Sequence, residues 1–556
     1  MPLIMITAGP LQAPPGPLET QPDGAILLSG DMQSGSPASD TLLTSGDMQS
    51  GSPSSDNEQT SIPSEGDGGG EGVQLPAFFM APAASGGDDS NPGTEDEPFL
   101  TLEKARDSMR GSSTKRTYLR AGTYNRTAEL TLTSSDNNEI WIAYPVETPI
   151  IDGGGGAVQF LDANGANGLT WKGITFANSN IPFASGELCL LVGCPNWIVE
   201  DCHHDTLADR IWRLQSGSDG CKFLGNTFDS CTDNHIRVEN SDNGVVAGNT
   251  VTNVLNGTSG IAPNFFGASG IEGWIIEYNS AENLAGAFSS IQDGGSVVNL
   301  NNTLRFNIII NALTEDWDDF GVMYQLGRSN AADTITLYDS NWIETWGHAF
   351  TTNPHHMAGI YLDDATSGVT LKNNVLIGGA EAKYAFFLHG GRNNEFFNNI
   401  ALLDTGTKLG NPNTANQMAL CNQQAFQNEV PGMVNNEFHT NILLSVNDAF
   451  AIASYGSNDW MTELGAGATG YMEPSVIQDL VRHQNINNWS GDTTETSSTA
   501  GDPEFSDAQN FDFELLNGAS NPARLEGFAD IVGVTDTAGA GPPSTWGIGG
   551  YDRANY

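Results

Sequence analysis

GNTF at 225–228, GNTV at 248–251, YNSA at 278–281 and FNII at 306–309 open the series of short phrases that decides the fold. SNWI at 340–343, NNVL at 373–376 and NNIA at 398–401 continue it. The asparagines of the series recur at steps of 23, 30, 28, 34, 33 and 25 residues: Asn226, Asn249, Asn279, Asn307, Asn341, Asn374 and Asn399. A period of this size indicates stacked supersecondary units. Each unit holds short β-prone runs split by Gly, Asn, Asp and Ser, which predicts coils of a parallel β-helix.

The repeated asparagine has a structural explanation. A buried turn leaves backbone polar groups that no sheet satisfies. An Asn at the same corner of every coil can bond its own turn and the Asn above and below, and it tolerates left-handed backbone angles. We therefore expect a ladder of asparagines that holds the scaffold, with function displayed elsewhere on the coils.

Composition narrows the classes of partner. The chain has 556 residues and a net charge of −46, with 21 Lys plus Arg against 67 Asp plus Glu. Such a field repels nucleic acid and anionic lipid, so we expect neither nucleic-acid binding nor membrane insertion. An anionic polysaccharide is also disfavoured, unless the few basic residues cluster or a divalent cation bridges.

The cysteines and the start of the chain restrict the function less than the net charge does. Five of the six cysteines lie between Cys189 and Cys231 without zinc-site spacing, which favours small buried core residues and leaves one disulfide between coils open. The opening MPLIMITAGPLQAPPGPL has no basic segment and is broken by prolines, unlike a secretory signal. We expect a virion or extracellular location, reached by another export route or by lysis.

The chain divides into five segments by pattern. Residues 1–75 are a Ser/Gly/Pro-rich arm in which SGDMQSGSP at 29–37 returns at 45–53, and its LLxSGD units resemble the attachment segments of bacteriophage fibres. We expect this arm to mediate attachment or linkage, and a homotrimer or larger assembly to form through it. The other segments are an N-terminal cap at 76–127, coils at 128–403, elaborated coils and loops at 404–500, and a C-terminal segment at 501–556.

The cap should contain one helix. Phe99, Leu102, Arg106 and Met109 form a stripe at helical spacing in FLTLEKARDSMR, and Thr101 is a plausible N-cap. An amphipathic helix would close the open end of the first coil. The expected fold class is thus all-β, a parallel β-helix solenoid with an N-terminal capping helix and an extended N-terminal arm.

Two terminal signatures resemble a known superfamily. SNPGTEDEPFLTLEKARD at 90–107 with RAGTY at 120–124, and DPEFSDAQNFDFELLNGASNPA at 502–523 with WGIGGYDR at 546–553, are similar to segments of right-handed parallel β-helix proteins of the pectate-lyase-like superfamily. The resemblance implies a right-handed coil and a polysaccharide as partner. Members include polysaccharide lyases, glycoside hydrolases and phage tail spikes, and the fold alone does not choose among them.

One strand position repeats from coil to coil and displays polar groups. In IYLDD at 360–364, alternation directs Tyr361 and Asp363 outward, and in FFLHG at 386–390 it directs Phe387 and His389 outward. The register of VMYQLG at 322–327 is ambiguous by one residue, which leaves the direction of Tyr324 open.

These strands and their loops supply the candidate site. Carboxylates beside aromatic residues suit glycoside hydrolysis, in which one carboxyl group is the acid and another the nucleophile or base. We assign catalysis to Asp319 and Asp364, which this alignment places on neighbouring coils, about 5 Å apart if stacked directly, the separation of a retaining pair. The expected substrate-binding residues are Asp318, Tyr324, Arg328, His356, Tyr361, Asp363, His389 and Arg392. The phrase DDFGVMYQLGR before GIYLDD also resembles a D-G-G-x-x-Y-x-x-G-R phrase of some β-helix glycoside hydrolases, with Phe320 in place of one Gly.

Less specific explanations remain open beside each assignment. Asp363 and Asp364 before Ala-Thr-Ser-Gly could form an Asx-type turn, and Asp318 and Asp319 a solvated acidic loop. His203 and His204 could bind a metal, although a fourth ligand is missing. We expect no cofactor and no metal, with calcium between the acidic loops as the exception.

The sequence supports three functions. The first is binding and cleavage of a cell-surface or extracellular polysaccharide by a tail-spike-like or virion-fibre-like protein, with glycoside hydrolysis as the favoured chemistry. The second is a secreted bacterial glycoside hydrolase or polysaccharide lyase. The third is a structural virion or surface protein without enzymatic activity. A lyase is the weaker enzyme because the lysines do not gather at one strand position.

Overall fold

The computed structural model describes residues 76–403 with gaps at 182–186, 209, 257–261, 294–298, 316–318, 328–333, 349–356, 380, 383, 390 and 398. Beyond residue 403 it describes only short strands between 418 and 515. The arm at 1–75 therefore lies outside the described residues. In the described part, no helix is long and apolar enough to cross a membrane.

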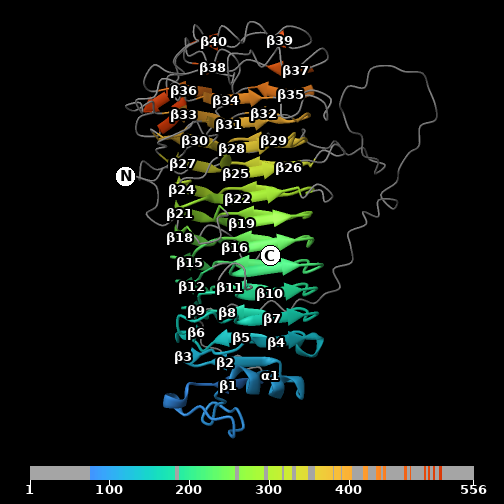
Figure 1. Cartoon of the computed structure of the whole chain (residues 1–556), viewed down its shortest axis with the longest axis vertical. Coiled ribbons are helices and arrows are strands. Elements are labelled where there is room, and N and C mark those ends of the chain that lie inside the picture. Colours follow the sequence, from blue (N-terminus) through green and yellow to red (C-terminus); the bar gives the residue numbers. More distant parts are fainter. Residues whose placement is uncertain are drawn as a thin grey trace, which may run out of the picture. The chain divides into compact units, whose positions relative to one another are not determined.

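The chain winds as a right-handed parallel β-helix with three parallel sheets. Each coil contributes one strand to sheet 1, then to sheet 2, then to sheet 3, and Figure 1 shows the strands stacked along the long axis. The 15 strands of sheet 1 are β1 (Phe78–Met80), β2 (Arg116–Leu119), β5 (Ile140–Ala143), β8 (Thr170–Lys172), β11 (Ile198–Glu200), β14 (Lys222–Leu224), β17 (Val245–Ala247), β20 (Ile275–Glu277), β23 (Thr303–Arg305), β26 (Thr336–Asp339), β29 (Val369–Lys372), β32 (Glu395–Phe397), β35 (Val434–His439), β37 (Thr469–Met472) and β39 (Thr494–Glu495).

Sheets 2 and 3 are built in the same way, with strands of successive coils stacked in parallel. The 14 strands of sheet 2 are β3 (Gly122–Asn125), β6 (Pro149–Asp152), β9 (Thr175–Ala177), β12 (His203–Asp205), β15 (Thr227–Asp229), β18 (Thr250–Val254), β21 (Ser280–Leu284), β24 (Ile308–Ala312), β27 (Trp342–Trp346), β30 (Val375–Gly378), β33 (Ile400–Leu403), β36 (Ile442–Ser445), β38 (Val476–Ile477) and β40 (Thr499–Ala500). The 11 strands of sheet 3 are β4 (Leu130–Thr133), β7 (Leu161–Asn164), β10 (Cys189–Val192), β13 (Trp212–Gln215), β16 (Asn234–Glu239), β19 (Asn264–Ser269), β22 (Ala287–Gln292), β25 (Phe320–Leu326), β28 (Met357–Asp363), β31 (Tyr384–His389) and β34 (Met418–Gln423). Strands β41 (Phe505–Asp507) and β42 (Asp512–Leu515) form a separate antiparallel pair.

The core fills the interior of the coils with one continuous apolar cluster. Aromatic rings stack along the axis, as Trp141 does on Trp171 with ring centroids 5.1 Å apart. The five described cysteines are buried and unpaired, so none of these five forms the disulfide left open by the sequence. Burial raises the pKa of the Cys202 thiol to about 12, which makes it an inert core residue.

The asparagine ladder forms at the turn between sheets 1 and 2. Asn279 donates from Nδ2 to Val246 O and to Asn307 Oδ1, both at 2.9 Å, and Asn307 repeats the pattern toward Asn341. All seven ladder asparagines are buried. The left-handed angles, however, belong to the residue before each of the first six asparagines, such as Tyr278 at φ 54° and Phe306 at φ 55°. The expectation of left-handed ladder asparagines is thus wrong, because the residue one position earlier turns the chain.

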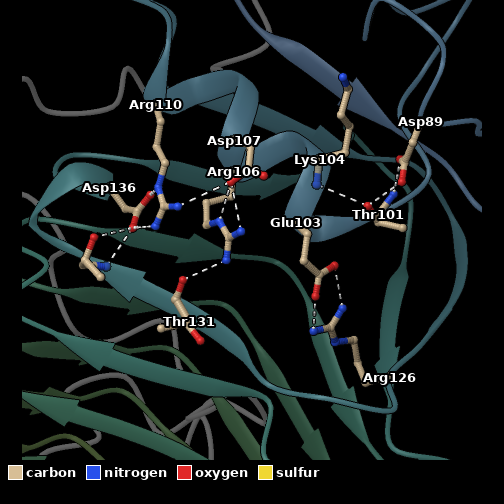
Figure 2. Close-up of polar contacts among 11 residues, drawn as sticks. Asp89, Thr101, Glu103, Lys104, Arg106, Asp107, Arg110, Arg126, Thr131 and Asp136 are labelled. Carbon is tan, nitrogen blue, oxygen red and sulfur yellow. Dashed lines mark hydrogen bonds and ion pairs between the residues drawn. The ribbon is translucent and has the colours of Figure 1, made fainter.

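One helix docks at the N-terminal end (Figure 2). Helix α1 (Leu102–Arg110) begins after Thr101, whose hydroxyl accepts from Lys104 N at 3.2 Å, as the sequence predicts. Its Leu102, Ala105 and Met109 are buried in the core cluster. Two short 3-10 turns, η1 (Ala83–Ser85) and η2 (Ser134–Asp136), lie in the same region of the chain. The role of α1 as a cap that closes the solenoid stays a prediction.

Ion pairs join this helix to the first coils. Arg110 contacts the carboxylate of Asp136 at 2.5 and 2.6 Å, and Arg126 contacts Glu103 at 2.7 Å, as drawn in Figure 2. These contacts tie residues 23 to 26 positions apart in sequence, so the helix has a defined seat on the solenoid.

Candidate active site

The candidate site lies on the outer face of sheet 3, on β25, β28 and β31. Ile360, Leu362, Phe386 and Leu388 belong to the core cluster inside the coils. The alternate residues form a separate cluster on the outer side, which confirms the predicted orientations of Tyr361 and Phe387. The members of this outer cluster are Tyr324, Ala358, Tyr361, Tyr384 and Phe387.

The register decides the open question about Tyr324. Tyr324 pairs with Tyr361 across β25 and β28, and Met323 beside it lies in the core. Tyr324 therefore faces outward with Tyr361, and the two rings meet edge to face at 5.3 Å between centroids.

Each of the two tyrosines donates a hydrogen bond to an aspartate. Tyr324 Oη lies 2.6 Å from Asp363 Oδ2, and Tyr361 Oη lies 2.8 Å from Asp319 Oδ1. Burial, followed by the charge of Asp363, raises the pKa of both phenols far above its usual value. The charges of Asp319 and Asp364 also raise the pKa of Tyr324. Both tyrosines thus stay neutral donors, and their hydrogen bonds go to two carboxylates, Asp363 and Asp319.

Asp363 accepts hydrogen bonds at both oxygens of its carboxylate. Its Oδ1 receives His389 Nδ1 at 2.6 Å and the backbone N–H of Asp364 at 2.7 Å, while its Oδ2 receives Tyr324. Since a carboxylate only accepts, Nδ1 of His389 is the donor in this hydrogen bond. Asp363 is 4% exposed, so we assign it a positioning role.

The turn after Asp363 presents Asp364. Asp364 and Ala365 have φ values of 44° and 64°, and the hydroxyl of Thr366 donates to Asp363 O at 2.6 Å and Gln325 O at 3.0 Å. The bond from Asp364 N to Asp363 Oδ1 reaches only one residue along the chain, whereas an Asx-type turn uses the N–H two residues on, so this bond is not an Asx-type turn. Left-handed non-glycine residues are strained, and the surrounding bonds fix this strain beside the carboxylate cluster.

Several expectations about the site need correction. Stacking does not place Asp319 beside Asp364, because Asp319 precedes β25 whereas Asp364 follows β28, at opposite ends of the paired strands. Asp319 reaches the cluster through its left-handed backbone at φ 60° and its bond to Tyr361 instead. The Tyr361 ring is fully buried and stacks on Phe387 at 4.4 Å, so it offers no face to a sugar.

The remaining assigned residues divide into two groups. Asp318, Arg328 and His356 lie outside the described residues. Arg392 acts through its backbone, which donates to Ser367 Oγ at 3.1 Å and accepts from Gly368 N at 2.9 Å, next to the turn.

Sequence reasoning missed Asp293, which follows β22. Gln292 pairs with Leu326, and Leu326 with Asp363, so Asp293 and Asp364 occupy equivalent positions two coils apart with Gly327 between them. Two strand spacings amount to about 10 Å. The signal was present in the aligned strand ends IQDGG at 291–295 and IYLDD at 360–364.

The residues at the site fit calcium poorly. One ligand atom from each of Asp363, Asp364 and His389 lies within 4.8 Å of the others. Calcium takes six to eight oxygen ligands, whereas this set includes a nitrogen and its Asp363 oxygens already accept hydrogen bonds. His204 turns inward, accepts from Trp212 Nε1 at 2.9 Å, and has a pKa lowered by burial to about 3, so His203 and His204 cannot share an ion.

Comparisons with known proteins add to the description of the fold. The sequence matches no protein-family profile and no curated protein. Among solved structures, the catalytic domain of a GH87 alpha-1,3-glucanase is 14% identical over 70% of each chain, with a TM-score of 0.48. A rhamnogalacturonan lyase is 13% identical with a TM-score of 0.37, covering 71% of this chain and 86% of that one. The GH136 lacto-N-biosidase from Eubacterium ramulus is 11% identical with a TM-score of 0.40, covering 72% and 67%. At these values the function must be argued from the site itself.

Proposed function

We propose that this protein is a carbohydrate-active enzyme that binds a polysaccharide along the outer face of sheet 3 and hydrolyses a glycosidic bond there. The observation that carries the proposal is that Asp319 and Asp363 each accept a hydrogen bond from a neutral tyrosine, with Asp364 next to Asp363 at the end of β28. A structural turn needs no such set, because Thr366 and Asp363 alone close it.

The proposed chemistry needs two carboxyl groups in different states. A protonated carboxyl gives its proton to the glycosidic oxygen as the bond to the anomeric carbon breaks. A carboxylate on the other side takes the proton of the attacking water, or attacks the carbon itself in a retaining enzyme. Asp364 is the central candidate, and its partner is either Asp319 or Asp293. The spacing of about 10 Å between the Asp293 and Asp364 positions favours an inverting reaction for that pair.

A glycan-degradation screen tests this proposal. Wild type is compared with Asp364→Asn, Asp319→Asn and Asp293→Asn, and Asp339→Asn serves as control because this carboxylate pairs with Lys372 on sheet 1. We expect Asp364→Asn to lose about a thousandfold of its turnover, since catalytic acid and base groups each contribute a hundredfold to ten-thousandfold. Of Asp319→Asn and Asp293→Asn, only the variant of the second catalytic carboxyl should show a loss of that size. Unchanged turnover in Asp364→Asn would refute the proposal.

The first product identifies the reaction. NMR of the newly formed reducing end shows inversion for an Asp293–Asp364 pair. Appearance of an unsaturated uronate with no reducing-end inversion would instead favour the lyase alternative.

The finer expectations about biological setting belong to the same proposal. We place the enzyme in an extracellular or virion setting, with α1 as the cap of the solenoid and residues 1–75 as its attachment segment. Deleting residues 1–75 should leave turnover intact and abolish a homotrimer or larger assembly, which light scattering measures. The tail-spike role rests only on the sequence of that arm.

A further inference from the structure

The outer face of sheet 2 changes from polar to apolar between β21 and β24. From β12 to β21 the outward residues are polar and at least half-exposed; they are His203, Asp205, Thr227, Asp229, Thr250, Thr252, Ser280 and Glu282. From β24 to β33 the residues paired with these positions in register are apolar, apart from Glu344. We call them the apolar face; they are Ile308, Ile310, Trp342, Val375, Ile377 and Ile400. The residues between them, such as Ile309, Ile343 and Leu376, belong to the core inside the coils.

The apolar face is buried although it points away from the core. Trp342 and Ile377 are 7% exposed, Val375 is 1% exposed and Ile400 is fully buried, while the outward isoleucines of β24 are half-buried. None of these side chains belongs to any of the three apolar clusters that the described residues form. Those clusters therefore do not account for the burial, and the face is a docking surface for another segment.

The apolar face lies on the coils that carry the candidate active site. Strands β24, β27 and β30 lead into β25, β28 and β31 of sheet 3, and Asp319 stands in the connection from β24 to β25. A segment bound to the apolar face would therefore be anchored on the same coils as the site.

We propose that the apolar face binds residues 1–8 of the same chain, MPLIMITA. This segment lies outside the described residues, and its composition carries the assignment: Leu3, Ile4, Met5 and Ile6 form an uninterrupted apolar run, with no charged side chain among the eight residues. A neutral segment suits a face whose single carboxylate, that of Glu344, already accepts from Trp342 Nε1 at 3.2 Å. Residues 9–75 suit it less, because they contain Asp and Glu but no Lys or Arg.

The connection to this segment has a suitable length. In the strand order of sheet 1, β23 and β32 of the coils with the apolar face lie eight and eleven steps from β1, where the arm joins the solenoid. At the usual strand spacing this is about 38 to 53 Å along the axis. A Ser/Gly-rich linker as long as residues 9–75 has a root-mean-square span of about 40 to 50 Å. The effective concentration of a tethered segment is highest when these two lengths match.

Two other occupants compete with residues 1–8. One is a segment after residue 403, and the other is a second copy of the protein. A disulfide experiment separates the three, because it reports which segment lies on the face and whether that segment belongs to the same chain. The inference does not rest on the proposed function, since it concerns the packing of this chain and no glycan takes part.

The experiment uses the full chain with pairs of introduced cysteines. Leu3→Cys, Ile4→Cys, Met5→Cys and Ile6→Cys are each combined with Val375→Cys. The matched control combines each with Thr250→Cys, four coils earlier at the equivalent position of sheet 2. Under mild oxidation, we expect the disulfide within one chain to form at least about tenfold faster with Val375→Cys, because four coils exceed the reach of a disulfide. Peptide mapping distinguishes it from disulfides of the native cysteines.

The other outcomes overturn the proposal. A disulfide between two chains would identify a second copy as the occupant. Equal rates with Val375→Cys and Thr250→Cys for all four positions, or no disulfide at any of them, would assign the face to a segment other than residues 1–8.

A second measurement leaves the apolar face unaltered, in case Val375→Cys does not fold. Hydroxyl-radical footprinting with mass spectrometry reports the oxidation of Trp342 in wild type, Ile4→Asp and Thr20→Asp. We expect Ile4→Asp to raise this oxidation severalfold, because a carboxylate opposes burial against an apolar face. Thr20→Asp adds the same charge within the linker and should change nothing, and Trp274 in the core should stay protected in all three proteins. Unchanged oxidation of Trp342 in Ile4→Asp overturns the proposal.

Discussion

Two columns of side chains run along the same solenoid and differ in how much they vary. The turn between sheets 1 and 2 repeats Asn in seven coils from Asn226 to Asn399. The outer face of sheet 3 changes at almost every coil, from Arg237 through Gly267 and Ser290 to Tyr324. Stacking is common to both, so stacking alone does not explain the difference.

The difference follows from where each side chain finds its partners. A ladder Asn bonds the next Asn along the axis, so each coil requires the same residue in its neighbour. On the outer face the partners come from other columns and loops, as Tyr361 does with Asp319 and Tyr324 with Asp363. Uniform columns therefore maintain the fold, whereas varied columns can carry function.

Breaking the uniform column should have the largest effect. Asn307→Ala removes the acceptor of Asn279 N and Nδ2 and the donor to Ile276 O and Asn341, all of them buried. Each unsatisfied buried group costs about 1–3 kcal/mol, so we expect a loss of roughly 3–6 kcal/mol, measured by urea unfolding. Asn125→Ala, at an exposed position of β3, should change stability by less than about 0.5 kcal/mol. Equal losses in both variants would contradict a special role for the ladder.

Removing one hydroxyl from the outer face of sheet 3 and one from the core sharpens the comparison. Tyr361→Phe keeps the ring on Phe387 but takes the donor from Asp319, so turnover should fall about ten- to a hundredfold with little change in stability. Tyr338→Phe removes the bond to Gln325 Oε1 at 3.0 Å inside the core, and should cost about 1 kcal/mol of stability while turnover is kept. Steady-state kinetics and thermal melting of both variants test these expectations. A loss of stability without a loss of turnover in Tyr361→Phe would show that the outer cluster is structural.

The sequence predicts the fold well because each repeat can be recognised from a short run of neighbouring residues. Asparagine spacing and β-prone runs predicted the parallel coil, and the alternation at 360–364 and 386–390 predicted the outward direction of Tyr361 and Phe387. The left-handed residue was misplaced by one position, since composition alone does not say whether Asn or its neighbour turns the chain.

The candidate site could be predicted only in part, because it depends on register and on long-range contacts. The pairing of β22, β25 and β28 sets Asp293 level with Asp364 and moves Asp319 to the other end of the strand. Arg210 bonds Glu187 and Arg213 bonds Glu239, pairs that lie 23 and 26 positions apart in the sequence. No local pattern in the sequence predicts these contacts between coils.

The smallest expected effect comes from the buried carboxyl group of Glu139. Glu139 is fully buried beside Asp136, and burial, then the Asp136 charge, raises the pKa of its carboxyl from 4.5 to about 9. Between those values the folded protein keeps a proton that the unfolded chain releases, so this group lowers stability as pH rises from about 4.5 to 9. Glu139→Gln removes the titration. We expect little difference from wild type at pH 5 and a gain of about 1–2 kcal/mol at pH 8, reduced by the amide's own need for partners. Melting curves across this range measure the gain, and a difference between variant and wild type that does not depend on pH would show that Glu139 is ionised in the folded protein.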